Sequence, residues 1–124
     1  MNQVLAIAAG GALGSVLRFW MSTWVHSFAS RAFPYGTLTV NVLGCLAMGF
    51  LFVLFVDRFS DNTVLRAGVL IGVLGGFTTF SSFSIETFNL IEQGEVVRAL
   101  LNIFGSLVLC VSATWLGVII GRQV

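Results

Sequence analysis

Charged side chains are scarce in this sequence. Aspartate, glutamate, lysine and arginine make up 9% of its 124 residues, whereas a soluble domain has roughly 25%. Lysine is absent, and six arginines against five acids leave a formal charge of +1. This nearly neutral balance excludes the basic surface that nucleic-acid binding requires, so we expect no nucleic-acid partner.

Cysteine is also scarce. The two cysteines, Cys45 and Cys110, both lie within apolar runs, which argues against a disulfide framework. The sequence contains neither a glycine-rich phosphate loop nor paired catalytic residues, and we therefore expect that the protein is not an enzyme. No basic segment precedes the first apolar run, so we expect no cleavable signal peptide.

Apolar residues dominate the rest of the chain, at 57% of the total and with a mean hydropathy of +1.01. A helix that crosses about 30 Å of hydrocarbon needs about 20 apolar residues. Four segments meet this requirement, at about residues 3–24, 34–56, 66–88 and 99–121. The sequence thus predicts an all-α membrane protein of four transmembrane helices, folded as a single domain over residues 1–124 and embedded in a lipid bilayer.

One stretch of the third segment departs from this apolar pattern. Residues 75–84 are Gly-Gly-Phe-Thr-Thr-Phe-Ser-Ser-Phe-Ser, with two glycines, five hydroxyl side chains, three phenylalanines and no aliphatic residue. Adjacent glycines followed by hydroxyl residues favour an unwound turn, so we expect the third helix to be broken in mid-membrane. Non-helical backbone at that depth is tolerated only where it is buried in protein or lines a cavity.

A broken helix has two electrically different ends. The end at Gly75 to Thr78 would present free carbonyls, which suit a cation, and the start at Phe80 would present free N–H groups, which suit an anion. Phe80 and Phe83 share a face, and the electropositive edge of an aromatic ring can contact a small anion. Simple packing is the alternative role for these rings.

Other polar residues lie at membrane depth, where they are expensive and mark functional sites. Arg18 is close enough to a helix end to snorkel to the interface, Asn41 is either an interhelical hydrogen-bonding residue or a ligand donor, and Glu86 is near a helix end. The fourth segment has small or polar residues at intervals of four, which share one face: Asn102, Ser106, Cys110 and Thr114. They either line a wet path or bond back to their own helix.

Two further patterns concern assembly. Glycines recur every four residues in the first, third and fourth segments, which lets helix backbones approach closely in lipid. Arginines are nearly balanced between the two sides of the membrane, so the positive-inside rule hardly fixes an orientation. Either a weak excess suffices, or the chain inserts both ways and pairs antiparallel, as in the inverted repeats of larger transporters.

Two motifs carry a resemblance that covers essentially the whole chain. They are Gly-Thr-Leu-Thr-Val-Asn-Val-Leu-Gly at 36–44 and the stretch at 75–84, and with them the chain closely resembles the Fluc (CrcB) family of fluoride channels. That resemblance implies an antiparallel, dual-topology homodimer with two fluoride pores in the bacterial inner membrane.

The resemblance also implies roles for residues. Phe80 and Phe83 would contact fluoride through ring edges, and Asn41 would be a pore-lining donor. A central sodium ion would be held by the backbone carbonyls of Gly75 and Thr78. The remaining positions that it places in or near the pore are Ser81, Ser106, Cys110 and Thr114 along the pore, and Arg18 and Glu86 at its mouths. Cys110 departs from the hydroxyl that is usual in the family.

The function implied is passive, fluoride-selective conduction that discharges fluoride accumulated as hydrofluoric acid. The alternative is a small proton-coupled multidrug exporter, which would need a membrane carboxylate, typically in the first helix. That helix contains Arg18 and no acid. A structural helper subunit would leave residues 75–84 unexplained.

Overall fold

The computed structural model describes all 124 residues, and every regular element in it is helical. Four stretches of helix are long and apolar enough to cross a membrane, and they are Asn2–His26, Tyr35–Asp57, Thr63–Glu92 and Val96–Gln123. These limits fall within four residues of those expected from the sequence. The prediction of an all-α protein with four spans is confirmed.

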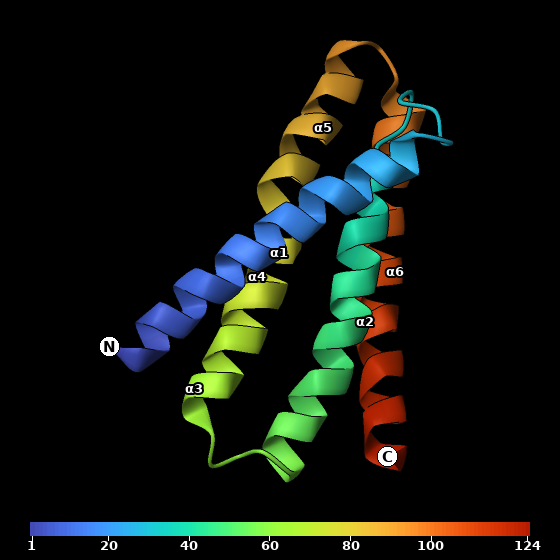
Figure 1. Ribbon diagram of the computed structural model, residues 1–124. Helices are drawn as coiled ribbons and strands as arrows, with labels where there is room; N and C mark the ends of the chain where they lie inside the picture. The colour runs from blue at the N-terminus through green and yellow to red at the C-terminus, as the bar shows by residue number, and fades with distance from the viewer.

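The four spans run back and forth between two ends of the molecule (Figure 1). The first, second and fourth are the continuous helices α1 (Asn2–His26), α2 (Tyr35–Asp57) and α6 (Val96–Gln123). The third is assembled from four pieces, which are α3 (Thr63–Arg66), the π-helix η1 (Ala67–Leu74), α4 (Gly75–Phe77) and α5 (Phe80–Glu92).

Side-chain hydrogen bonds and one glycine mark the ends of these helices. The side chain of Asn62 accepts the Leu65 N–H at 2.9 Å and caps α3, as helix N-termini require. Gly94, with φ of +79°, is the only residue with positive φ and follows α5. The imidazole Nε2 of His26 accepts the Gly36 N–H at 3.1 Å, which ties the end of α1 to the first turn of α2.

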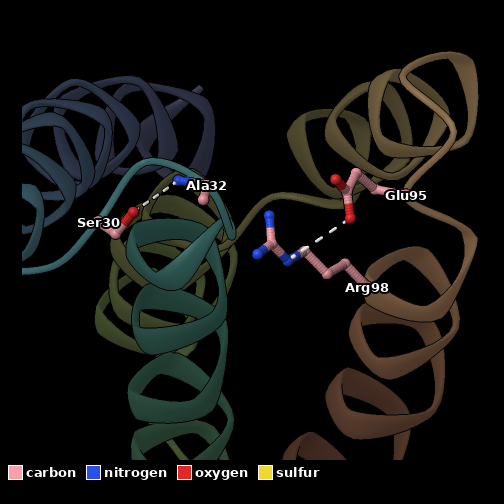
Figure 2. Close-up of polar contacts among 4 residues, drawn as sticks. All are labelled: Ser30, Ala32, Glu95 and Arg98. Atoms are coloured by element: carbon pink, nitrogen blue, oxygen red, sulfur yellow. Dashed lines mark hydrogen bonds and ion pairs between the residues drawn. The ribbon is translucent and has the colours of Figure 1, made fainter.

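The connections at this end of the bundle also carry a local hydrogen bond and an exposed ion pair (Figure 2). The Ser30 hydroxyl accepts the Ala32 N–H at 3.0 Å. Arg98 Nε lies 3.8 Å from Glu95 Oε2, and both side chains are 46% exposed. An exposed ion pair of this kind contributes at most about 1 kcal/mol, so Arg98 and Glu95 add little to the stability of the fold.

The glycine pair of the third span is helical, and the extended backbone begins after it. Gly75 has φ −63° and ψ −38°, and the extended residues are Thr78 (φ −83°, ψ 159°) and Thr79 (φ −152°, ψ 123°). At Gly76 an added Cβ would lie 2.8 Å from the Gly11 carbonyl oxygen. That glycine therefore serves the close approach of α1 rather than an unusual backbone angle.

Glycines lie at the close contacts of two helix pairs, α1 with η1 and α2 with α6, as their four-residue spacing predicted. Against η1, a Cβ on Gly10 or Gly14 of α1 would overlap backbone oxygens of Gly68 or Val73. Between α2 and α6, a Cβ on Gly117 would overlap the Leu46 carbonyl. Backbones packed this closely gain van der Waals contact, which replaces the hydrophobic effect as the driving force in lipid.

The outer surface is strongly apolar. Only 23 of 124 residues are buried, while Phe19, Trp20, Leu101 and Phe104 each expose at least 60% of their area. A soluble monomer rarely exposes such a surface, whereas lipid solvates it without cost. With its four spans, the chain is a multi-pass membrane protein.

The adjacent residues Gly10 and Gly11 test the packing of α1. In Gly10→Ala the methyl group would meet the Gly68 carbonyl and lie 3.0 Å from Val73 N, and backbone cannot move aside as a side chain can. We expect a loss of about 1–3 kcal/mol, the usual cost of overpacking, seen as a lower unfolding temperature in detergent. Gly11→Ala, whose methyl has its nearest neighbour at 4.0 Å, should unfold like the wild type. Equal unfolding temperatures for the two variants would contradict this account.

Candidate ion-binding site

Asn41 of α2 bonds twice to the extended residue Thr79. Its Nδ2 donates to the Thr79 carbonyl at 2.9 Å, and its Oδ1 accepts the Thr79 N–H at 2.8 Å. In a continuous α-helix that N–H would donate to the carbonyl of Gly75. One side chain thus replaces the helical partners of Thr79, and the Gly75 carbonyl lacks its usual donor.

Threonine hydroxyl groups form hydrogen bonds at the end of α4 and at the start of α5. The N–H and the hydroxyl of Thr78 both donate to the Leu74 carbonyl, at 3.0 and 2.9 Å. The Thr79 hydroxyl accepts the Ser82 N–H at 3.2 Å and lies 3.3 Å from the Ser81 hydroxyl, so it is the N-cap of α5. The positive end of the α5 dipole therefore begins at Phe80.

Phe80 and Phe83 lie together on this first turn of α5. Their ring centroids are 5.4 Å apart with an interplanar angle of 45°. Phe80 is 77% exposed and Phe83 is half-buried. Tilted rings leave hydrogen-bearing edges free, and those edges carry the positive part of the ring quadrupole.

Both rings line a cavity of about 500 Å³ between α2, α5 and α6, here called the phenylalanine cavity. Its lining includes six residues predicted for the site, namely Asn41, Thr78, Phe80, Phe83, Ser106 and Cys110. The structure therefore brings together positions that are up to 69 residues apart in the chain. No charged side chain lines the cavity, and Cys45, Met48 and Thr79 join it without having been predicted.

Besides Arg18 and Glu86, which line a different cavity, three of the expected residues lie outside this cavity. Ser81 is exposed and Gly75 is not part of the lining. The Thr114 hydroxyl donates to the Cys110 carbonyl at 3.1 Å, which is the back-bonding alternative for a hydroxyl residue inside a helix. The roles of all these residues stay predictions.

A buried chain of hydrogen bonds holds α5 against α6. The Thr87 hydroxyl donates to the Phe83 carbonyl at 2.7 Å, Asn102 donates to Thr87 at 2.8 Å, and Ser106 donates to Asn102 at 3.4 Å. Asn102 is only 2% exposed. Sequence reasoning missed Thr87, although a lone hydroxyl one turn after Phe83 was a usable signal.

Arg18 and Glu86, from α1 and α5, line a second cavity of about 320 Å³, here called the arginine cavity. The rest of its lining is rich in hydroxyl groups and includes Ser82 and Thr79. No ion pair joins Arg18 to Glu86, and Glu86 Oε1 is buried without a hydrogen-bond partner.

A third, polar cavity of about 190 Å³ lies at the loop end of the bundle, here called the outer cavity. Glu86 lines it together with His26, Arg31, Asn89 and Gln93. The three cavities are neighbours that share lining residues. Glu86 is shared by the outer and arginine cavities, and Thr79 is shared by the arginine and phenylalanine cavities.

The arrangement has known counterparts. Residues 5–118 match the family described as CrcB-like protein, Camphor Resistance (CrcB). The chain belongs to the CrcB family. The resemblance that the two motifs indicated is thereby confirmed.

Individual relatives agree over nearly the full chain. Proteins named Fluoride-specific ion channel FluC are 46% identical over 121 residues in Methylococcus capsulatus, 48% over 122 in Magnetococcus marinus and 51% over 122 in Coxiella burnetii. Each match covers 98% of this CrcB-family chain. The matched region covers 99% of the length of the Magnetococcus protein and 98% of the Coxiella protein, but only 53% of the longer Methylococcus protein.

The double hydrogen bond of Asn41 can be tested without measuring transport. In Asn41→Leu the N–H and the carbonyl of Thr79 both lose their partners, and unpaired buried backbone groups cost about 1–3 kcal/mol. We expect faster deuterium exchange at residues 78–82 and a lower unfolding temperature. Asn89→Ala, which removes an exposed asparagine of α5, is the control and should change neither. Unchanged exchange in Asn41→Leu would show that Thr79 does not depend on it.

Proposed function

We propose that this protein is a fluoride-selective ion channel that lets fluoride leave the cell passively and so limits fluoride toxicity. The relatives that match along the whole chain carry the name of such a channel. The single observation that supports it most is the phenylalanine cavity. An uncharged cavity that combines an amide, hydroxyl groups and two aromatic rings suits a small anion that must be bound and then released.

The three neighbouring cavities, which share Glu86 and Thr79 as lining residues, suggest the route. An anion would enter the outer cavity beside Arg31, continue past Arg18 in the arginine cavity, and reach the phenylalanine cavity at Thr79. Charged side chains lie along the first two cavities and are absent from the third. Fluoride would thus exchange its hydration water for hydrogen-bond donors of the protein step by step. In the phenylalanine cavity it would meet Asn41. The amide of Asn41 has a second N–H, besides the one bonded to Thr79, that could donate to the ion.

Selectivity would follow from the size of the anion and from the nature of its contacts. Fluoride is the smallest halide ion and the strongest hydrogen-bond acceptor among the halides, so amide and hydroxyl donors and ring edges can approach it closely. Chloride is larger and would need a wider path. No step in this process makes or breaks a covalent bond, so the protein acts as a channel and not as an enzyme.

We further propose that the third span acts as a broken helix in mid-membrane and that two chains assemble as an antiparallel, dual-topology homodimer. The extended angles of Thr78 and Thr79 support the break. The broad apolar surface, on which even Phe80 is 77% exposed, is suited to cover by a second copy. The balanced arginines of the sequence favour insertion in both orientations.

Labelling from the two sides of the membrane tests this topology. A cysteine introduced at Ser30 in the exposed loop, in a background with Cys45 and Cys110 replaced, should react with an impermeant maleimide from both sides in about equal amounts. Asn62→Cys, in the loop at the opposite end, should give the same ratio. Labelling of Ser30→Cys from one side only, with Asn62→Cys labelled from the other, would rule out dual topology.

We also propose a sodium ion bound by backbone carbonyls of Gly75 and Thr78. These residues fit such an ion, because the Gly75 carbonyl has lost its usual N–H partner to Asn41 and carbonyl oxygens are the ligands that sodium finds in unwound helices. The ion would supply a fixed positive charge between the two copies. Replacement of sodium by an organic cation should lower the thermal stability of the purified dimer, and no change would argue against the site.

The location that fits this function is the inner membrane of a bacterium, in which the chain would lie as a multi-pass protein. The alternative, a proton-coupled multidrug exporter, is not supported by the relatives, which are named as fluoride channels.

Ion efflux from proteoliposomes decides the main proposal. Vesicles loaded with potassium fluoride or potassium chloride are diluted into potassium-free buffer, and a potassium ionophore is added. We expect rapid fluoride efflux, almost no chloride efflux, and no need for a proton gradient. Equal rates for the two anions, or fluoride movement only with a proton gradient, would overturn the channel function.

Phe80→Ile tests the ring edges in the same assay. The isoleucine side chain keeps an apolar surface but removes the electropositive edge, so we expect fluoride efflux to fall by at least about tenfold, which corresponds to about 1.4 kcal/mol in the barrier. Phe104→Ile, which changes an exposed ring of α6, is the control. Normal efflux in Phe80→Ile would exclude the ring from the mechanism.

A further inference from the structure

Three sulfur atoms gather on the phenylalanine cavity. Cys45 and Met48 come from α2, and Cys110 comes from α6. Cys45 and Met48 are three residues apart, so they share a face of α2, and both cysteines line the same cavity. Both cysteines are free thiols and half-buried, and they are the only cysteines in the chain.

This grouping is not explained by conduction of an anion. A hard, small anion gains little from sulfur, and Cys110 takes a position where hydroxyl donors would serve better. Thiol and thioether sulfur atoms are instead the donors that select soft cations such as monovalent copper. The chain has no cluster of three or more histidine, cysteine, aspartate or glutamate residues, so zinc, which prefers four such ligands, is not the natural occupant.

We propose that Cys45, Cys110 and Met48 form a binding site for a soft monovalent cation, copper(I) or silver(I), inside the phenylalanine cavity. One thiol would lose its proton and bind the metal as a thiolate, while the second thiol and the thioether bind as neutral donors. The balance is R–SH + Ag⁺ → R–S–Ag + H⁺, with no change of oxidation state. The product is electrically neutral, which suits a cavity without charged side chains, because an isolated charge there is costly.

Silver binding to the purified full-length protein in nitrate buffer is the first test. We expect one silver ion and one released proton per chain, measured by titration calorimetry in two buffers of different ionisation enthalpy. Because the second sulfur ligand acts at high effective concentration, Cys45→Ser and Cys110→Ser should each bind about 100-fold more weakly. Met48→Leu, a swap that conserves volume, should weaken binding by a smaller factor.

Met21→Leu is the matched control, since Met21 lines a separate apolar cavity with Trp20 and Trp24. It should bind silver like the wild type. Two silver ions per chain, or an equal loss in Met21→Leu and Met48→Leu, would overturn the three-sulfur site. If a cysteine variant fails to fold, alkylation of the wild-type protein tests whether both thiols bind the same silver ion. One bound silver ion should then protect both thiols from N-ethylmaleimide. Protection of one thiol alone would refute the shared site.

Block of fluoride efflux is the functional consequence, and this part alone rests on the proposed function. At a silver concentration well above its dissociation constant, efflux from wild-type proteoliposomes should fall by at least about tenfold, with each cysteine variant compared with its own silver-free rate. Loss of block in both cysteine variants supports the site. Binding without block would show that the metal site is real but does not lie on the conduction path.

Discussion

Two hydrogen bonds between the amide of Asn41 and the backbone of Thr79 hold the part of the structure on which the rest depends. Within a bilayer each backbone N–H and C=O must find a partner in the protein, because water is absent. The extended Thr79 cannot find these partners within its own span. Asn41 supplies both from α2, and as a result the Gly75 carbonyl is released and α5 starts afresh at Phe80. One side chain thus converts a single span into two helix ends with opposite polarity.

Close packing allows so short a side chain to reach its target. Gly44 lies one turn after Asn41 on α2, and a Cβ there would overlap the Thr78 methyl group. The motif at 36–44 therefore has one structural role, with an asparagine that bonds the extended backbone and a glycine that admits it. On the other side, Gly14 and Gly76 bring α1 against the same segment, at the Val73 carbonyl and the Gly11 carbonyl. The extended residues are enclosed by protein backbone from two directions, which is the condition for non-helical structure at membrane depth.

The sequence alone allowed the large features to be predicted, since they depend on local composition. Four spans follow from the length of apolar runs, and helix contacts follow from glycine spacing. The position of the extended residues could not be predicted, because Asn41 decides it from 38 residues away, and the glycine pair that looked responsible has a packing role. The link from Thr87 to Asn102 is likewise a tertiary contact. Six predicted site residues do line one cavity, while for Thr114 the sequence left two alternatives open, of which the structure shows the bond to its own helix.

The distribution of charge along the three cavities gives the proposed route its physical logic. Conduction requires a site that binds an ion well enough to admit it and weakly enough to release it. Arg31 and Arg18 lie along the outer and arginine cavities, where water and the nearby Glu86 moderate their fields. The phenylalanine cavity contains dipoles and ring edges but no charge. A side chain with a full positive charge inside the cavity would hold fluoride more tightly than partial charges do and would slow its release. A site made from partial charges releases the ion more readily. Because the cavity also has no carboxylate, the three sulfur atoms are the strongest ligands that a soft cation would meet there.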